Sequence, residues 1–222
     1  MPYVFQFGVI TDHLPELLYG ATLTIELSAA SMACGLGVAL VGATAQTLGP
    51  KPLRWAIRAY IELIRNTPFL VQLFILYFSL PALGIRMRAQ DAAILAMSIN
   101  VGAYATEILR GGIESIPHGQ IDAARALALT RFQIFRKIVL PPAIRAVYPA
   151  LSSQFILLML ASSVVSTISA TELTAITNTL QSTTFRAFEF YFVATGMYLV
   201  MAIGFRFVLR GLQRLIFGRQ PA

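Results

Sequence analysis

Long apolar stretches with almost no charged residues set the limits on what this chain can fold into. Residues 66–85 and 146–171 contain no Asp, Glu, Lys or Arg. About 20 such residues are the length that a helix needs to cross the hydrocarbon core of a bilayer. With 57% hydrophobic and only 12% charged residues among 222, the chain is far more apolar than a soluble domain, a disordered chain or a coiled coil. The sequence therefore predicts an integral membrane protein.

Five segments are long and apolar enough to be membrane-spanning helices. We expect an all-α protein whose 222 residues form a single transmembrane domain without an internal repeat. Pro68 lies near the start of the second span and is expected to kink it. The predicted spans are residues 17–45, 59–83, 89–109, 146–171 and 188–209.

The basic residues lie mostly on one side of these predicted spans. Thirteen of the 17 Lys and Arg residues fall between the first and second spans, between the third and fourth spans, or at the end of the fifth span and beyond it. Because cytoplasmic loops are enriched in Lys and Arg, the C-terminus and the loop at 111–145 are expected in the cytoplasm and the N-terminus outside. This distribution also accounts for the net charge of +7 without nucleic-acid binding.

The loop at 111–145 is too long for a simple turn and carries signals of its own. Pro117 suits the first turn of a short helix. Thr130 and Gln133 match a capping box that starts a second short helix, which Pro141 and Pro142 are expected to end. We expect a helix–break–helix at the cytoplasmic surface of the membrane. An idle amphipathic hairpin remains the alternative on physical grounds.

Several polar or charged side chains fall within or near the predicted spans, where they need protein or water around them. Glu62 and Arg65 are spaced to pair along one helix, as are Glu107 and Arg110. Such polar residues can hold helices together or line a transport pathway, and both interpretations stay open. The candidate pathway residues are Glu26, Arg65, Asn100, Gln154, Ser162 and Ser163.

A basic stripe and an absence of catalytic motifs complete the sequence-based prediction. Arg206, Arg210 and Arg214 share one helical face, which suits a snorkelling helix end or a contact with anionic lipid or a partner. His13 and His118 are isolated, and no Gly-x-Ser-x-Gly, His-Glu-x-x-His or Walker motif occurs. We therefore expect no enzyme activity, metal or cofactor in this chain itself.

The loop carries a family resemblance. The stretch GQIDAARALALTRFQIFRKIVLPPAIRAVYPAL resembles the EAA loop of binding-protein-dependent ABC importers. Four more stretches match in order: LLYGATLTIELSAAS, YIELIRNTPFLVQLFILYFSLPALGI, NVGAYATEILRGGIESIP and SSVVSTISATEL. Over residues 17–173 the chain is similar to permeases of the polar amino acid uptake family.

The resemblance implies a type I ABC importer permease fold with five transmembrane helices and a cytoplasmic coupling helix, in the bacterial inner membrane. Two permease subunits, identical or homologous, would form the pathway for a polar amino acid. An ATPase dimer that uses ATP and Mg would drive it, and an extracytoplasmic binding protein would deliver the solute. The residues implied in ATPase coupling are Gly119, Gln120, Asp122, Ala123, Ala124, Arg125, Leu127, Ala128 and Leu129.

The chain departs from the family pattern at three places. Asp122 stands where the family has Glu, Ala128 where it has Gly, and residues 160–161 are Leu-Ala where a charged pair is common. If the turn at Ala128 requires a left-handed backbone, alanine costs on the order of 1 kcal/mol there. The competing interpretation is a self-sufficient secondary transporter or channel. Five spans without a repeat argue against the common designs of that class.

Overall fold

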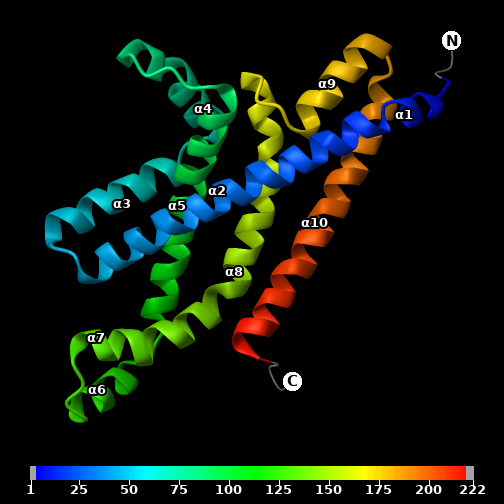
Figure 1. Ribbon diagram of the computed structural model, residues 1–222. Helices are drawn as coiled ribbons and strands as arrows, with labels where there is room; N and C mark the ends of the chain where they lie inside the picture. Colours follow the sequence, from blue (N-terminus) through cyan, green and yellow to red (C-terminus); the bar gives the residue numbers. More distant parts are fainter. Residues whose placement is uncertain (1–3, 219–222) are drawn as a thin grey trace.

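The computed structural model describes residues 4–218, and the regular elements in this range are all helical (Figure 1). The expectation of an all-α protein is confirmed. The long helices are α2 (Leu14–Leu48), α5 (Ala89–Glu114), α8 (Leu140–Ala161) and α10 (Ala187–Phe217). The shorter ones are α1 (Gly8–Asp12), α3 (Lys51–Arg65), α4 (Phe69–Ser79), α6 (His118–Ala126), α7 (Arg131–Ile134) and α9 (Leu173–Thr184).

The second predicted span is not one kinked helix but two helices. α3 ends at Arg65, α4 begins at Phe69, and the two are bent by 108°. Pro68 is the cause, because proline lacks a backbone N–H and disfavours helical geometry at the residue before it. Within residues 4–218, four helices are long and apolar enough to cross a membrane, or five spans are present when α3 and α4 together count as one.

The helix that begins at Arg131 does not end at Pro141 and Pro142, so that expectation was wrong. α7 continues through a π-helical turn, Phe135–Val139, directly into α8. Pro141 and Pro142 occupy the first turn of α8, where a missing backbone N–H costs little. The π-helical turn shifts the hydrogen-bond register just before them, and the helical path continues to Ile168 through a 3₁₀ segment, Ser162–Ile168.

Small residues bring α2 and α5 into close contact where the two helices cross. A Cβ atom added to Gly35 would lie 2.2 Å from Val101 Cγ1, and one added to Gly42 would lie 2.7 Å from the Thr106 hydroxyl. Glycine at these positions allows two backbones to approach as they do in membrane helix pairs. The Tyr60 hydroxyl adds α3 to this pair by donating to the Ile99 carbonyl at 2.6 Å.

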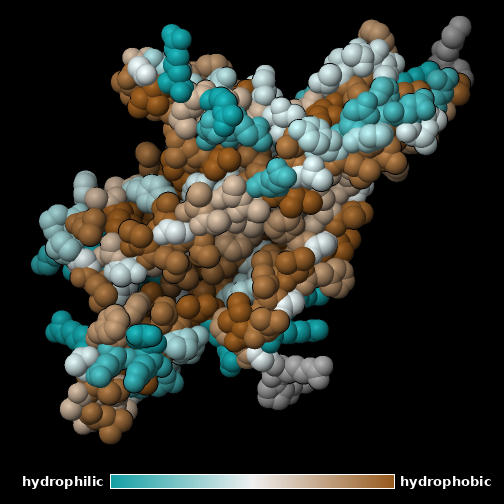
Figure 2. Space-filling model, in the orientation of Figure 1, coloured by the Kyte–Doolittle hydropathy of each residue, from teal (hydrophilic) through white to brown (hydrophobic). Residues whose placement is uncertain are grey.

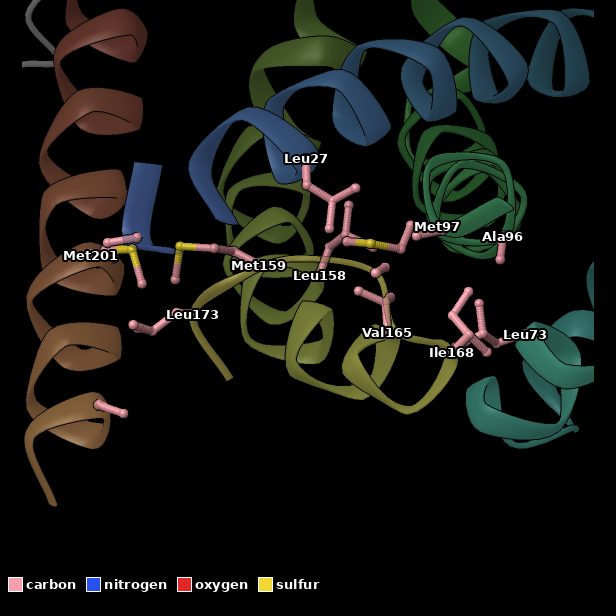
Figure 3. Packing of buried hydrophobic residues seen from close by; sticks show 14 of the residues in the cluster. Leu27, Leu73, Ala96, Met97, Leu158, Met159, Val165, Ile168, Leu173 and Met201 are labelled. Atoms are coloured by element: carbon pink, nitrogen blue, oxygen red, sulfur yellow. The ribbon is translucent and has the colours of Figure 1, made fainter. Parts of the chain in front are cut away.

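The main core lies where α2, α5, α8 and α10 meet the loop before α9. Leu27, Met97, Leu158, Met159 and Leu173 are almost fully buried there (Figure 3). The backbone N–H of Leu173 donates to the buried hydroxyl of Thr24 at 3.0 Å, which ties the start of α9 to α2.

The surface separates into an apolar middle and polar ends. In Figure 2, hydrophobic residues cover the central body, while hydrophilic residues gather around α6 and α7 at the lower end and around α1 and the far ends of other helices at the top. α10 is the most exposed long helix, with Phe192, Val200 and Phe207 each more than 65% exposed. This distribution suits a bilayer around the middle.

Candidate functional site

The segment from α6 to α7, which we call the elbow (residues 117–134), folds back onto the start of α8. Its inner side forms a small separate core, so α6 is held against protein. Ala124 is 3% exposed, and Ile121 and Leu129 are half-buried beside it. The other buried residues of this core are Ile116, Ile134, Val139 and Ala143.

The outer side of the elbow presents apolar side chains that no residue of the described range, 4–218, covers. Leu127 is 77% exposed and Phe132 is 67% exposed. Of the nine implied coupling residues, Ala124 faces inward and Leu129 is half-buried. The other seven are exposed: Gly119, Gln120, Asp122, Ala123, Arg125, Leu127 and Ala128.

The corner of the elbow is built by local backbone geometry. Ala128 adopts φ +56°, so the turn does require the left-handed conformation that alanine disfavours. The N–H of Leu129 donates to the Ala124 carbonyl at 3.2 Å. The predicted capping box is confirmed, because the Thr130 hydroxyl accepts from the Gln133 N–H and the Gln133 amide oxygen accepts from the Thr130 N–H.

The charges near the end of α5 pair differently from one of the two predictions. Arg110 bonds to both Glu107 and Glu114, which confirms the predicted Glu107–Arg110 pair. The predicted Glu62–Arg65 pair is wrong: the Arg65 guanidinium lies 4.0 Å from Glu107 and 5.5 Å above the centre of the Tyr104 ring. Because α3 ends at Arg65, that side chain is free to reach across to α5.

A polar pocket of about 220 Å³ lies beside the break between α3 and α4. It brings together two of the predicted pathway residues, Asn100 from α5 and Gln154 from α8, with Thr67 from the break and Tyr104. Phe69, Leu157, Leu158 and Ala161 form its apolar lining. Arg65 lies next to this pocket through its contact with Tyr104.

Gln72, which the sequence analysis did not single out, holds the break together. Its side-chain N–H groups donate to the carbonyls of Ile64 at 2.8 Å and Thr67 at 3.0 Å, and its oxygen accepts from Asn100 at 2.9 Å. Carbonyls freed by a broken helix need such partners within a membrane. The one signal in the sequence that could have indicated this role is that Gln72 lies in the first helical turn after Pro68.

The other predicted pathway residues lie away from this pocket. Glu26 is exposed on α2. Ser162 is buried and donates to the Met159 carbonyl, and Ser163 donates to the Leu160 carbonyl. The two serine hydroxyls thus bind backbone carbonyls at the point where α8 passes into the 3₁₀ segment. Within residues 4–218, no group of three His, Cys, Asp or Glu side chains could hold a metal ion.

The fold and these two features define a class: a helical membrane subunit with a broken span beside a polar pocket, and an exposed elbow at one end of the bundle. The chain belongs to the family of binding-protein-dependent transport system inner membrane components, whose model matches residues 35–219. It is therefore a permease subunit of a type I ABC importer, as its resemblance implies.

Individual relatives agree with this assignment. The chain is 34% identical over 212 residues to the glutamine transport system permease protein GlnP of Escherichia coli (strain K12), covering 95% of this chain and 97% of that protein. It is 40% identical over 159 residues to the L-cystine transport system permease protein TcyB of Bacillus subtilis (strain 168), covering 72% and 68% respectively.

Solved structures show the same fold. The crystal structure of an amino acid ABC transporter with histidines is similar, with a TM-score of 0.89 and 33% identity over 96% of this chain and 99% of that one. An inward-facing structure of the MetNI methionine ABC transporter has a TM-score of 0.73 at 21% identity, over 90% and 95% of the two chains.

Proposed function

We propose that this permease subunit carries a polar amino acid across the bacterial inner membrane, with the elbow and the C-terminus in the cytoplasm. The relatives' substrates, which include glutamine and cystine, support this class of solute. The excess of basic residues around the elbow supports its cytoplasmic location. A separate ATPase dimer consuming ATP and Mg supplies the energy, and an outer binding protein delivers the solute.

The exposed apolar side of the elbow is the observation that carries the coupling proposal. Leu127 exposes 77% of its surface at the tip of a compact, internally packed unit. An exposed apolar side chain on a polar end of the molecule suits insertion into a pocket of a partner. We assign that partner as the ATPase subunit and the exposed residues of 119–128 as the contact.

The test is co-purification of the ATPase with the permease. Leu127→Asp should abolish it and the solute-stimulated ATPase activity in liposomes, because a charge cannot enter an apolar pocket. Phe185→Asn is the matched control: Phe185 is 86% exposed with φ +56°, so asparagine is tolerated there. Retained co-purification of Leu127→Asp would contradict this contact, and uptake without any ATPase would favour a secondary transporter.

The polar pocket beside the broken span is our proposed station for the amino acid. Asn100, Gln154 and Thr67 offer hydrogen-bond donors and acceptors for a polar solute, next to the positive N-terminal end of α4. Discontinuous helices serve this purpose in other transporters. Glu26, Ser162 and Ser163 are not part of this station.

Replacing Gln154 by Leu tests the station separately from the elbow. Solute uptake should fall at least tenfold while ATPase co-purification stays unchanged, because the variant removes only polar groups that line the pocket. Ser163→Ala, outside the pocket, serves as the control. Unchanged uptake in Gln154→Leu would place the station elsewhere in the pathway.

A further inference from the structure

A second hollow, of about 530 Å³, lies between α8 and the second half of α10. Its polar lining consists of Arg206, Arg210 and Gln213 from α10 and Ser152 and Ser153 from α8. The remainder is apolar and includes Leu157, Leu160 and Leu209. One part of the wall of this hollow is therefore cationic and polar, and the other part is apolar.

Across the described residues, 4–218, neither Arg206 nor Arg210 has an acidic partner. Within residues 4–218, neither guanidinium makes a hydrogen bond or ion pair, and no Asp or Glu lines the hollow. Other membrane-end arginines are paired: Arg110 with Glu107 and Glu114, and Arg145 with the Phe217 carbonyl. Both side chains are exposed near the end of a long apolar helix, where arginine reaches the membrane interface and can bind an anion.

The depth of the arginines along α10 matches a lipid headgroup. At 1.5 Å per residue, Arg206 lies about 29 Å and Arg210 about 35 Å from the start of the helix at Ala187. A hydrocarbon core about 30 Å thick therefore ends near them. By the distribution of basic residues this is the cytoplasmic leaflet, where anionic lipids attract Lys and Arg.

The walls of the hollow are held in place close to the arginines. The Tyr148 hydroxyl of α8 donates to the Leu209 carbonyl of α10 at 2.7 Å, and Arg145 donates to the Phe217 carbonyl at 2.6 Å. These bonds fix α8 beside α10 and so fix the serines opposite the arginines. The hollow is a groove between two helices that hydrogen bonds hold together.

We propose that this groove binds one anionic phospholipid of the cytoplasmic leaflet. Arg206 and Arg210 hold its phosphate, Gln213 and the serine hydroxyls add polar contacts, and an acyl chain lies along Leu157 and Leu160. The site is distinct from the polar pocket and from the elbow, and it goes beyond the transport function proposed above.

The test measures lipid retained by the purified permease–ATPase complex. The complex is equilibrated in nanodiscs of phosphatidylcholine with one-fifth phosphatidylglycerol, extracted in mild detergent, and its bound lipids are quantified by native mass spectrometry. The wild type should retain phosphatidylglycerol in preference to phosphatidylcholine. Arg206→Gln with Arg210→Gln should weaken this retention roughly 30-fold, from about 1 kcal/mol per basic residue.

Two further variants make the result specific. Arg214→Gln removes the same charge one turn further along α10, outside the hollow, and should retain the lipid like the wild type. Arg206→Lys with Arg210→Lys should restore most of the retention, because it restores both positive charges. Equal co-purification of the ATPase and an unchanged melting temperature in the double glutamine variant check that this variant is folded.

Three outcomes would overturn the proposal. The first is equal phosphatidylglycerol retention by the wild type and the double glutamine variant. The second is no preference of the wild type for phosphatidylglycerol over phosphatidylcholine. The third is loss of permease pairing in the double glutamine variant with lipid retention unchanged, which would show that a second permease subunit covers the groove.

Discussion

At the scale of single residues, Ala128 determines the geometry of the elbow at a cost. Its φ of +56° is a conformation that glycine adopts freely and alanine does not. The turn connects α6 to the capped start of α7, so the conformation is imposed by packing on both sides. Alanine therefore holds a left-handed turn here that glycine would adopt without the steric penalty.

Ala128→Gly should stabilise the elbow by about 1 kcal/mol, because it removes the steric penalty of the left-handed conformation. Hydrogen exchange at the amides of residues 118–134 should slow accordingly. Ala123→Gly, at an exposed position inside α6, should do the opposite, since glycine destabilises a helix interior by about 0.5–1 kcal/mol. Equal changes in hydrogen exchange for the two variants would contradict a steric penalty at Ala128.

A buried carboxylate at the start of α9 is the second residue with a measurable consequence. Glu172 is fully buried, its Oε1 accepts from the Ala175 N–H at 2.7 Å, and its Oε2 accepts from the Tyr198 hydroxyl at 2.5 Å. Burial raises the pKa of Glu172 above its usual 4.5 despite these hydrogen bonds. The folded protein therefore holds this proton more tightly than the unfolded chain does.

The stability that this proton contributes is present below pH 4.5 and is lost as pH rises through the folded pKa. In Glu172→Gln the amide oxygen can still accept from the Ala175 N–H, and the amide N–H can donate to the Tyr198 hydroxyl, without a charge. Its melting temperature should therefore rise relative to the wild type as pH increases. Glu172→Ala should be less stable than Glu172→Gln by about 2 kcal/mol at every pH, because it loses the helix cap and one of the two hydrogen bonds of the Tyr198 hydroxyl, which keeps only Thr174. A pH-independent difference between wild type and Glu172→Gln would contradict the raised pKa.

At the scale of elements, the contact between α2 and α5 depends on which glycines face the partner helix. A Cβ atom at Gly35 would lie 2.2 Å from Val101 Cγ1 and 3.1 Å from the Ser98 carbonyl, whereas one at Gly37 would meet nothing within 4 Å. The two positions lie two residues apart on the same helix. The same substitution at each therefore distinguishes the effect of packing from the effect of helix propensity.

Gly35→Ala should destabilise the protein by about 1–3 kcal/mol, because the methyl group must push α5 away or strain Val101. Gly37→Ala should be neutral or stabilising by up to about 1 kcal/mol, since alanine favours the helix. Thermal unfolding in detergent measures both. A destabilised Gly37→Ala would mean that a second subunit or a lipid packs on that face.

The helices were predictable from the sequence, and their interruptions were less so. Apolar runs predicted the long helices, and the Thr130–Gln133 capping box predicted the start of α7. Both signals are local, because the residues that carry them are close together in the sequence. The fate of three prolines did not follow in the same way. Pro68 directly precedes α4 at a bend of 108°, whereas Pro141 and Pro142 lie in the first turn of α8 after a π-helical turn. The residue type alone does not indicate which of these prolines lies at a bend.

The sequence could indicate single polar residues of the candidate site but not the contacts between residues on different helices. Asn100 and Gln154 were recognised as polar residues in apolar spans, and they share a pocket. The partner of Arg65 was missed because Glu107 lies on another helix, and Gln72 was missed because its role depends on the break. Spacing along one helix cannot indicate either contact.

At the scale of the whole molecule, the orientation in the membrane follows from the charges and awaits a direct test. In a Cys34→Ser background, which removes the exposed native thiol, Phe185→Cys should react with a membrane-impermeant maleimide added to intact spheroplasts. Leu127→Cys, expressed without the ATPase, should react only after permeabilisation, because the proposed orientation places the elbow in the cytoplasm. Labelling of Leu127→Cys from outside would invert the topology.

One unbroken helical path, from Arg131 at the elbow to Ile168, passes Gln154 in the polar pocket. Twenty-three residues separate Arg131 from Gln154, which is about 35 Å of helix. A lever of that length moves its far end by about 3 Å for each 5° of tilt, the length of a hydrogen bond. Since no loop interrupts this path, a displacement of the elbow by the proposed ATPase contact would move the pocket around Gln154 at the same time.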